Sequence, residues 1–353
     1  METEALLSKA DLIVAGGKVV TLDPAGTIAE AIAIKGERIL AVGRTQAIAE
    51  FVSPQTQQIN AAGRLVVPGL IDGHAHMDRE GLKDTLPSLA GCRSINEICE
   101  RIRHLAEETP PGDWIVTMPV GEPPFYQDVP ELLSEGRFPD RHDLDRAAPD
   151  HPVYIRAIWG HWRNTLPLVS IANTRALERA GITSATQSPS ANIYIEAISP
   201  GGQLTGRFFE SLYKPLVEKT LMACIPRFTL EQRITGLQRS MQVYNGYGTT
   251  SVFEGHGVAG EVLAAYQHLR AAGPLPVRAN LMFSPAWPNV DAAAVKDLLL
   301  DWGRWLAGRG LGDEYLRMAG LYTEADYSEE NRLRALCGPY TGWAGFNFDA
   351  ALP

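Results

Sequence analysis

The strongest constraint on the fold is a regular alternation of apolar runs with amphipathic segments from Arg64 onward. The apolar runs are short, whereas Leu and Ala recur at helical spacing between them. Strands that alternate with helices form a parallel sheet covered by those helices. The pattern therefore predicts an α/β fold. The candidate strands are residues 65–71, 114–120, 153–158, 249–254, 277–283 and 316–321.

Two of the intervening helices have clear beginnings. Ser-Ile-Asn-Glu at residues 94–97 and Thr-Leu-Glu-Gln at residues 229–232 are capping boxes. They predict helices that reach about Glu107 and about Asn245. Further helices are expected at residues 174–180, 260–272 and 290–308, because Leu and Ala recur there every three or four positions.

The N-terminal part differs from the rest of the chain. Residues 11–66 contain short Val- and Ile-rich runs separated by Gly-Gly and Asp-Pro, which predicts a small β-module. We place the domain boundary between residues 1–66 and 67–353. Residues 121–150 and 181–206 are rich in Pro, Gly, Ser and Asp, and predict long loops over one face of the sheet.

Composition limits the classes of partner. The 353 residues carry a net charge of -9, which disfavours nucleic acid and anionic membranes and leaves a small molecule as the expected partner. The four cysteines include no Cys-x-x-Cys pair, so reduced thiols are expected. The acidic N-terminus is unlike a secretory signal, and no apolar stretch approaches 18 residues. We expect a cytoplasmic protein, and a homo-oligomer remains open.

The sharpest chemical signal is a pair of histidines that follows an apolar strand. In Val-Val-Pro-Gly-Leu-Ile-Asp-Gly-His-Ala-His, alternation along an extended chain places Asp72, His74 and His76 on the same side. Two converging imidazoles form half of a divalent metal site, and imidazole suits zinc. The alternative is a pair of solvated histidines in a turn.

An acidic and a basic residue, Glu254 and His256, stand at the end of the strand predicted at residues 249–254. Glu254 and His256 share a face at this strand end, so Glu254 is a candidate metal ligand and His256 a candidate pocket residue. A solvated or ion-paired strand end is the alternative for Glu254. His161 and Trp162 follow another strand and are candidates to bind substrate, with a purely structural role as the alternative.

A competing motif is Gly-His-Gly-Val-Ala-Gly at residues 255–260. This GxGxxG pattern follows a predicted strand and begins a predicted helix, as in a dinucleotide-binding fold. The next strand ends in Ser284-Pro285 without an acidic residue to hold a ribose. A tight turn between strand and helix is the preferred interpretation, and a nicotinamide-dependent oxidoreductase is the alternative.

Several short motifs occur in a characteristic order along the chain. They are His74-Ala-His76 and residues 15–23, 31–39, 41–43, 143–145, 149–150, 152–156, 160–161, 173–177, 206–207 and 248–252. This order resembles the amidohydrolase superfamily, and most of all its family 3 branch of N-substituted formamide deformylase-like enzymes, over nearly the whole chain. The resemblance implies a (β/α)8 TIM-like barrel, an N-terminal β-sandwich module, and a hydrolase that cleaves amide-like C–N bonds with a divalent metal, zinc, manganese or cobalt.

Two departures from the family pattern affect the expected chemistry. Tyr322 stands where many relatives have a lysine that is carboxylated and bridges two metals, and a phenol cannot form a carbamate. The family's later metal-binding histidines and catalytic aspartate are expected beyond residue 353, so no catalytic residue is assigned. The chain resembles the N-terminal part of a longer enzyme with six of eight barrel strands. An inactive fragment or pseudoenzyme is therefore the second hypothesis.

Overall fold

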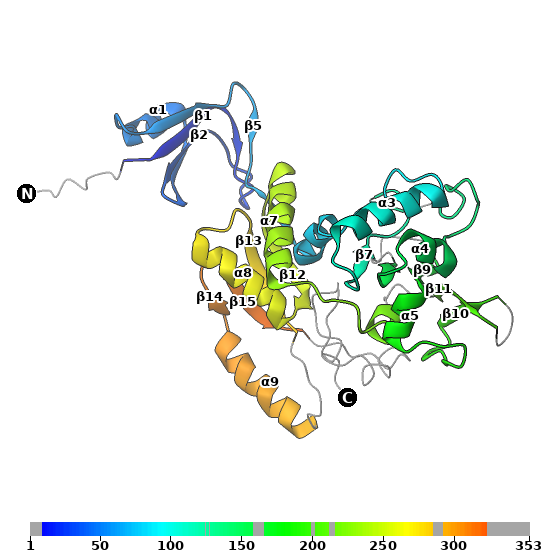
Figure 1. Ribbon diagram of the computed structural model, residues 1–353. Coiled ribbons are helices and arrows are strands. Elements are labelled where there is room, and N and C mark those ends of the chain that lie inside the picture. The colour runs from blue at the N-terminus through cyan, green and yellow to red at the C-terminus, as the bar shows by residue number, and fades with distance from the viewer. Residues whose placement is uncertain are drawn as a thin grey trace, which may run out of the picture. The chain divides into compact units, whose positions relative to one another are not determined.

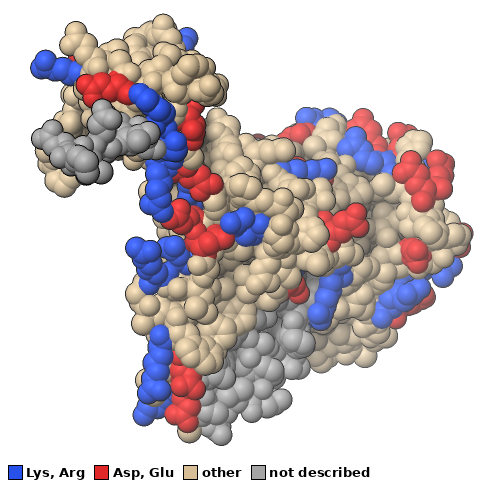
Figure 2. Space-filling model, turned by 90° about the vertical axis from the view of Figure 1, so that its left-hand side faces the viewer, with Lys and Arg blue, Asp and Glu red and all other residues tan. Residues whose placement is uncertain are grey.

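The computed structural model describes residues 9–123, 125–126, 128–157, 166–198, 202–211, 216–284 and 292–322. The chain divides into two compact units, Met1–Leu70 and Ile71–Pro353 (Figure 1). None of the helices in the described residues combines the length and hydropathy of a membrane span. Lys and Arg residues lie interspersed with Asp and Glu on the face of the molecule in Figure 2.

The first unit is built on one five-stranded sheet with the order β3-β2-β1-β4, in which β5 also pairs with β1. One face is buried because the small side chains of Ala31 and Ala33 let Ile13 pack against Ile48 of a short helix. The β-sandwich stays a prediction, since the described residues of this unit form a single sheet. The elements are β1 (Leu12–Val20), β2 (Ile28–Lys35), β3 (Arg38–Gly43), α1 (Thr45–Ile48), η1 (Ala49–Phe51), β4 (Gln57–Asn60) and β5 (Leu65–Val66).

The second unit contains a mixed sheet with the order β10-β11-β9-β8-β7. Only β7 and β8 are parallel in this sheet, and the other neighbours are antiparallel. Ile98 and Ile102 of α3 pack on this sheet against Ile115 and Val153. The elements are α3 (Ile95–Glu108), β7 (Ile115–Thr117), α4 (Arg141–Ala147), β8 (Val153–Ile155), β9 (Leu168–Ala172), α5 (Thr174–Ala180), β10 (Ile193–Ala197), β11 (Leu204–Glu210) and α6 (Leu216–Lys219).

The other sheet of this unit has the order β14-β15-β13-β12-β6. β12, β13 and β15 are parallel, and β14 is antiparallel to β15. Leu237 of α7 and Tyr266 of α8 are buried against this sheet with Val252 and Leu281. The elements are β6 (Leu70–Asp72), α2 (Met77–Glu80), η2 (Gly81–Asp84), α7 (Leu230–Gly246), β12 (Thr249–Val258), α8 (Gly260–Ala272), β13 (Arg278–Phe283), α9 (Ala292–Leu306), β14 (Leu311–Gly312) and β15 (Leu316–Leu321).

The helices predicted from sequence are confirmed. The Ser94 hydroxyl accepts a hydrogen bond from the backbone N–H of Glu97 (3.2 Å) at the start of α3. At the start of α7, Thr229 and Gln232 each accept a hydrogen bond from the other's backbone N–H. The remaining predicted helices correspond to α5, α8 and α9. Local capping and periodicity were sufficient to predict these helices, because both depend only on residues that are close in the sequence.

The prediction of one parallel sheet is wrong. The predicted strands at residues 114–120 and 153–158 contain β7 and β8, which belong to the mixed sheet. The predicted strand at residues 65–71 divides into β5 and β6, and Pro68, which has no N–H to donate, lies between them. The described strands form two open sheets in the second unit and no closed barrel.

The two predicted loops also contain regular structure. Residues 181–206 include β10 and the start of β11, and residues 121–150 include α4. β10 is the edge strand of its sheet and pairs only with β11 among the described strands. An antiparallel strand of this kind can have apolar residues on one face alone. The alternation of apolar and polar residues in β10 is short and lies between polar segments, so the sequence pattern did not predict this strand.

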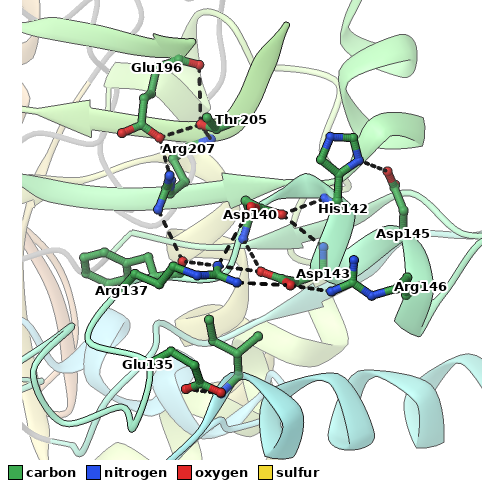
Figure 3. A network of polar contacts seen from close by, with 12 residues as sticks. Glu135, Arg137, Asp140, His142, Asp143, Asp145, Arg146, Glu196, Thr205 and Arg207 are labelled. Atoms are coloured by element: carbon green, nitrogen blue, oxygen red, sulfur yellow. Dashed lines mark hydrogen bonds and ion pairs between the residues drawn. The ribbon is translucent and has the colours of Figure 1, made fainter. Parts of the chain in front are cut away.

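A network of charged side chains holds α4 against the mixed sheet (Figure 3). The buried carboxylate of Asp143 accepts hydrogen bonds from Arg137 (2.7 Å) and Arg146 (2.6 Å). Burial tends to raise the pKa of Asp143, but these partners outweigh it and leave the pKa below its ordinary value. Arg207 donates one hydrogen bond to the carboxylate of Glu196 (2.6 Å) and another to the backbone carbonyl of Phe138. The network is therefore structural.

Glu210, at the end of β11, is an acid whose burial disfavours its charged form. Its side chain is 1% exposed, and Oε1 accepts a hydrogen bond from the backbone N–H of Val217 (2.9 Å). Within the described part of the chain Oε2 has no hydrogen-bond partner. Burial raises the pKa of Glu210 from 4.5 to about 8, and the nearby charge of Glu218 acts in the same direction. Folding therefore favours the protonated acid.

We predict that Glu210→Gln makes the protein more stable in alkaline solution. A raised pKa in the folded state means that stability is full below about pH 4.5 and is lost as the pH rises through about 8. The variant keeps an acceptor for Val217 without this loss, so its free energy of unfolding at pH 9 should exceed that of the parent by at least about 1 kcal/mol. Urea denaturation at pH 5 and pH 9 measures the difference. The exposed Glu231→Gln is the control, and equal pH dependence of all three proteins would contradict the prediction.

Candidate functional site

The parallel strands β12, β13 and β15 end at one edge of their sheet, and the segment after β6 lies against β12. His74 and His76 follow β6, and Tyr322 follows β15. Backbone hydrogen bonds hold these segments in register: Ala75 N–H donates to Phe253 O (2.9 Å), and Tyr322 N–H donates to Phe283 O (2.7 Å). Ligands of open α/β sheets bind at this edge, so it is the place to look for a site.

The two histidines lie together as the sequence predicts. Their ring centroids are 5.0 Å apart and the rings are nearly perpendicular, at 88°. They lie after the end of β6 rather than within it, and the backbone N–H of His74 donates to the carboxylate of Asp72 (3.0 Å). A Cβ atom on Gly255 would lie 3.3 Å from Nδ1 of His74, so glycine allows this ring to approach β12 closely.

Glu254 is buried beneath the turn that carries these histidines. Its side chain is 2% exposed. One oxygen, Oε1, accepts hydrogen bonds from the backbone N–H groups of Met77 (2.8 Å) and Asp78 (3.3 Å) and from the hydroxyl of Tyr266 (2.9 Å). Met77 and Asp78 form the first turn of α2, directly after His76. Glu254 therefore ties β12 to the segment that positions His76.

Asp78 is a buried acid at this site that sequence reasoning missed. It is 4% exposed, and burial raises its pKa to about 6 against the lowering effect of the Arg79 and Arg233 charges. Burial, followed by the charge of Asp78, raises the pKa of Glu254 to about 8. The available signal was the spacing His-x-His-x-Asp, which continues the alternation of the histidine pair by one step.

The donor atoms fit part of a metal site. Two imidazoles from one turn are suitable ligands for a divalent ion. Glu254 lies beside them, but its Oε1 is already engaged by three donors. Among the residues that the structure describes, no three His, Cys, Asp or Glu side chains form a group able to hold a metal ion. The described chain thus supplies the histidine pair without a complete ligand set.

The remaining predicted site residues are only partly described. His161 and Trp162 lie outside the described residues, and so does the side chain of His256, although its backbone is part of β12. The glycine motif is not a phosphate loop here, because Gly255 and Gly257 lie within the strand. A Cβ atom on Gly257 would lie 2.7 Å from Cβ of Tyr322. This glycine therefore makes room for Tyr322, and the geometry disfavours the dinucleotide interpretation.

Comparison with known proteins agrees with the histidine motif. The profile of the amidohydrolase family matches residues 57–351. The chain belongs to the amidohydrolase family. The resemblance inferred from the motifs is therefore confirmed, and it extends over most of the chain.

Two curated relatives match this chain over part of their own length. Protein LONG AFTER FAR-RED 3 of Arabidopsis thaliana is 26% identical over 245 residues, which are 69% of this chain and 38% of that protein. N-substituted formamide deformylase of Arthrobacter pascens is 26% identical over 271 residues, which are 75% of this chain and 46% of that enzyme. The chain spans less than half the length of these two relatives.

A solved structure resembles this chain in fold. The crystal structure of an uncharacterized metal-dependent hydrolase from Pyrococcus horikoshii superposes with a TM-score of 0.59 at 20% sequence identity. The similarity covers 90% of this chain and 55% of that protein. The architecture of the chain is therefore one that a longer hydrolase also adopts.

We predict that Glu254→Ala destabilises this chain by about 3 kcal/mol, because it leaves three donors around a buried position without their acceptor. Glu254→Gln retains an acceptor of the same size, so its cost should be below about 1 kcal/mol. Tyr266→Phe, which removes one of the donors, is the matched control and should cost about 1 kcal/mol. Urea denaturation at pH 7 measures all three. Equal stability of Glu254→Ala and the parent would contradict the proposed tie between β12 and α2.

Proposed function

We propose that this chain is part of a metal-dependent hydrolase that cleaves an amide-like C–N bond of a small molecule. The observation that carries the proposal is the pair of imidazoles, 5.0 Å apart, at the carboxyl edge of the parallel strands β12, β13 and β15. Family membership supports hydrolysis, and the relative from Arthrobacter pascens is named for the removal of formyl groups from N-substituted formamides.

His74 and His76 hold the metal in this proposal, and zinc, manganese or cobalt suits such ligands. When bound, a divalent ion lowers the pKa of water and polarises a substrate carbonyl. Glu254 positions the turn after His76, and it remains a candidate third ligand through Oε2. His161, Trp162 and His256 are proposed to line the substrate pocket.

We further propose that β6, β12, β13 and β15 are the first four strands of a (β/α)8 barrel. Their order in the sheet equals their order in the sequence, and α7, α8 and α9 precede β12, β13 and β15 as barrel helices do. The mixed sheet β7–β11 is then an insertion between the first and second barrel strands. This arrangement supports a site at the edge where the histidines lie, because barrel enzymes keep their active sites there.

An inactive chain is the second candidate. The described residues supply only two imidazoles and no three-ligand group, and a weakly bound metal without turnover is the expected behaviour of such a site. The experiment below distinguishes the two.

Metal content tests the proposal directly. The purified chain, dialysed against equimolar Zn²⁺, Mn²⁺ and Co²⁺, should retain close to one equivalent of metal by mass spectrometry. His74→Ala with His76→Ala should retain at most a tenth of that amount, whereas His268→Ala, a histidine on α8, should be unchanged. Release of amine from N-benzylformamide then reports turnover. Failure of the parent to retain metal overturns the proposal, and retained metal without amine release supports the inactive candidate.

The role of Glu254 as a ligand has its own test. Glu254→Gln keeps the size and the acceptor for α2 but removes the ionisable carboxyl group that a metal would bind. If Glu254 is a ligand, the affinity for Zn²⁺ should fall more than about 100-fold, since loss of a supporting contact alone costs about 10–100-fold. Tyr266→Phe is the control for altered hydrogen bonding at Glu254. Unchanged metal stoichiometry and affinity in Glu254→Gln would show that Glu254 only positions His76.

A further inference from the structure

Two rings from distant parts of the chain lie against the same short stretch of β12. A Cβ atom on Gly255 would lie 3.3 Å from Nδ1 of His74. A Cβ atom on Gly257 would lie 2.7 Å from Cβ and 2.9 Å from Cγ of Tyr322. The two glycines are two positions apart in the strand, so their Cα atoms are at most about 7.6 Å apart. Tyr322 is therefore a neighbour of the histidine pair.

The position of Tyr322 depends on glycine at residue 257. A Cβ atom there would overlap both Cβ and the ring of Tyr322. Gly257 also has a φ of 80°, a conformation that residues with a side chain rarely adopt. Two separate features thus keep β12 free of a side chain at this point, and the tyrosine ring lies directly on the strand backbone.

Backbone hydrogen bonds fix the segment that carries Tyr322. Its N–H donates to the carbonyl of Phe283, the last residue of β13 (2.7 Å). The next residue, Ser284, is fully buried, and its N–H donates to the carbonyl of Val258, the last residue of β12 (2.9 Å). These bonds connect the ends of β15, β13 and β12 in turn. The sheet itself therefore holds Tyr322 beside β12.

The histidine pair needs a further ligand, and a charged one suits it best. Zinc sites have three or four protein ligands, and a neutral imidazole carries no charge to balance a divalent ion. Glu254 is 2% exposed and its Oε1 already accepts three hydrogen bonds, whereas Tyr322 is only half-buried. A phenol becomes an anionic oxygen ligand when it loses its proton, and a bound cation favours that loss.

We propose that Tyr322 is a ligand of the metal that His74 and His76 hold, through its phenolate oxygen. The inference rests on the proposed function, because it adds a ligand to that same metal. One bond forms, between the phenolate oxygen and the ion. One bond breaks, the phenol O–H, and its proton passes to the solvent. No electron is transferred.

Copper is a suitable probe, because sites with nitrogen and oxygen donors bind Cu²⁺ more tightly than other divalent ions of the first transition series. A phenolate bound to Cu²⁺ gives an intense charge-transfer band in the visible region, where imidazoles alone give only weak d–d bands. The full chain, freed of metal with EDTA and desalted, should develop this band with one equivalent of Cu²⁺. Ring-deuterated tyrosine should shift the resonance Raman lines excited in the band.

Two variants identify the tyrosine. Tyr322→Phe should lose the band and bind Zn²⁺ more than about 100-fold more weakly, since loss of a supporting contact alone costs about 10–100-fold. Gly257→Ala places a Cβ atom where the ring of Tyr322 lies and should also lose the band.

The matched controls should keep the band. Tyr315→Phe removes a phenol at the opposite end of β15. Gly260→Ala adds a Cβ atom that would meet nothing within 4 Å.

The outcomes separate this inference from the proposed function. A parent chain that binds Cu²⁺ without the band, or a band that persists in Tyr322→Phe, overturns the inference and leaves the metal on the histidines. A parent chain that binds no Cu²⁺ overturns the proposed function and the inference with it. Circular dichroism melting verifies that each variant is folded. If Tyr322→Phe does not fold, Gly257→Ala and the deuterated parent decide the question.

Discussion

The hydrogen bonds between Glu254 and the first turn of α2 are the interaction on which the candidate site depends. β6 is only three residues long, so it cannot by itself fix the segment that follows. One buried carboxyl oxygen joins Met77 and Asp78 to the middle of β12. The position of His76 relative to His74 follows from this tie, because His76 directly precedes the turn.

Burying acids beneath the histidines has an electrostatic cost that the surrounding residues reduce. Asp78 and Glu254 lie close together, and burial raises the pKa of each. Arg79 and Arg233 oppose this shift at Asp78, and Arg233 is itself paired with Glu261 at 2.5 Å. Such clusters of shifted acids are concentrated at functional sites, although structural ion pairs also produce them.

The location of the mixed sheet explains both the success and the failure of sequence reasoning about the fold. The strands β7 and β8 have the same apolar character as β12 and β13, so the pattern assigned all of them to one sheet. Which strands pair depends on contacts between residues more than a hundred positions apart, such as those of β6 with β12. Periodicity in a short window contains no information about such pairing.

The amino-acid sequence by itself determined the helices α3, α5, α7, α8 and α9, the α/β class, the histidine pair and the family. Capping boxes, helical periodicity and the spacing of His74 and His76 are all relations between close neighbours in the chain. Only the tertiary structure decided that Asp78 and Glu254 are buried together, that Gly257 makes room for Tyr322, and that His74 lies against Gly255 of the same strand. Burial and close approach depend on segments distant in sequence, and a single sequence does not state which of them meet.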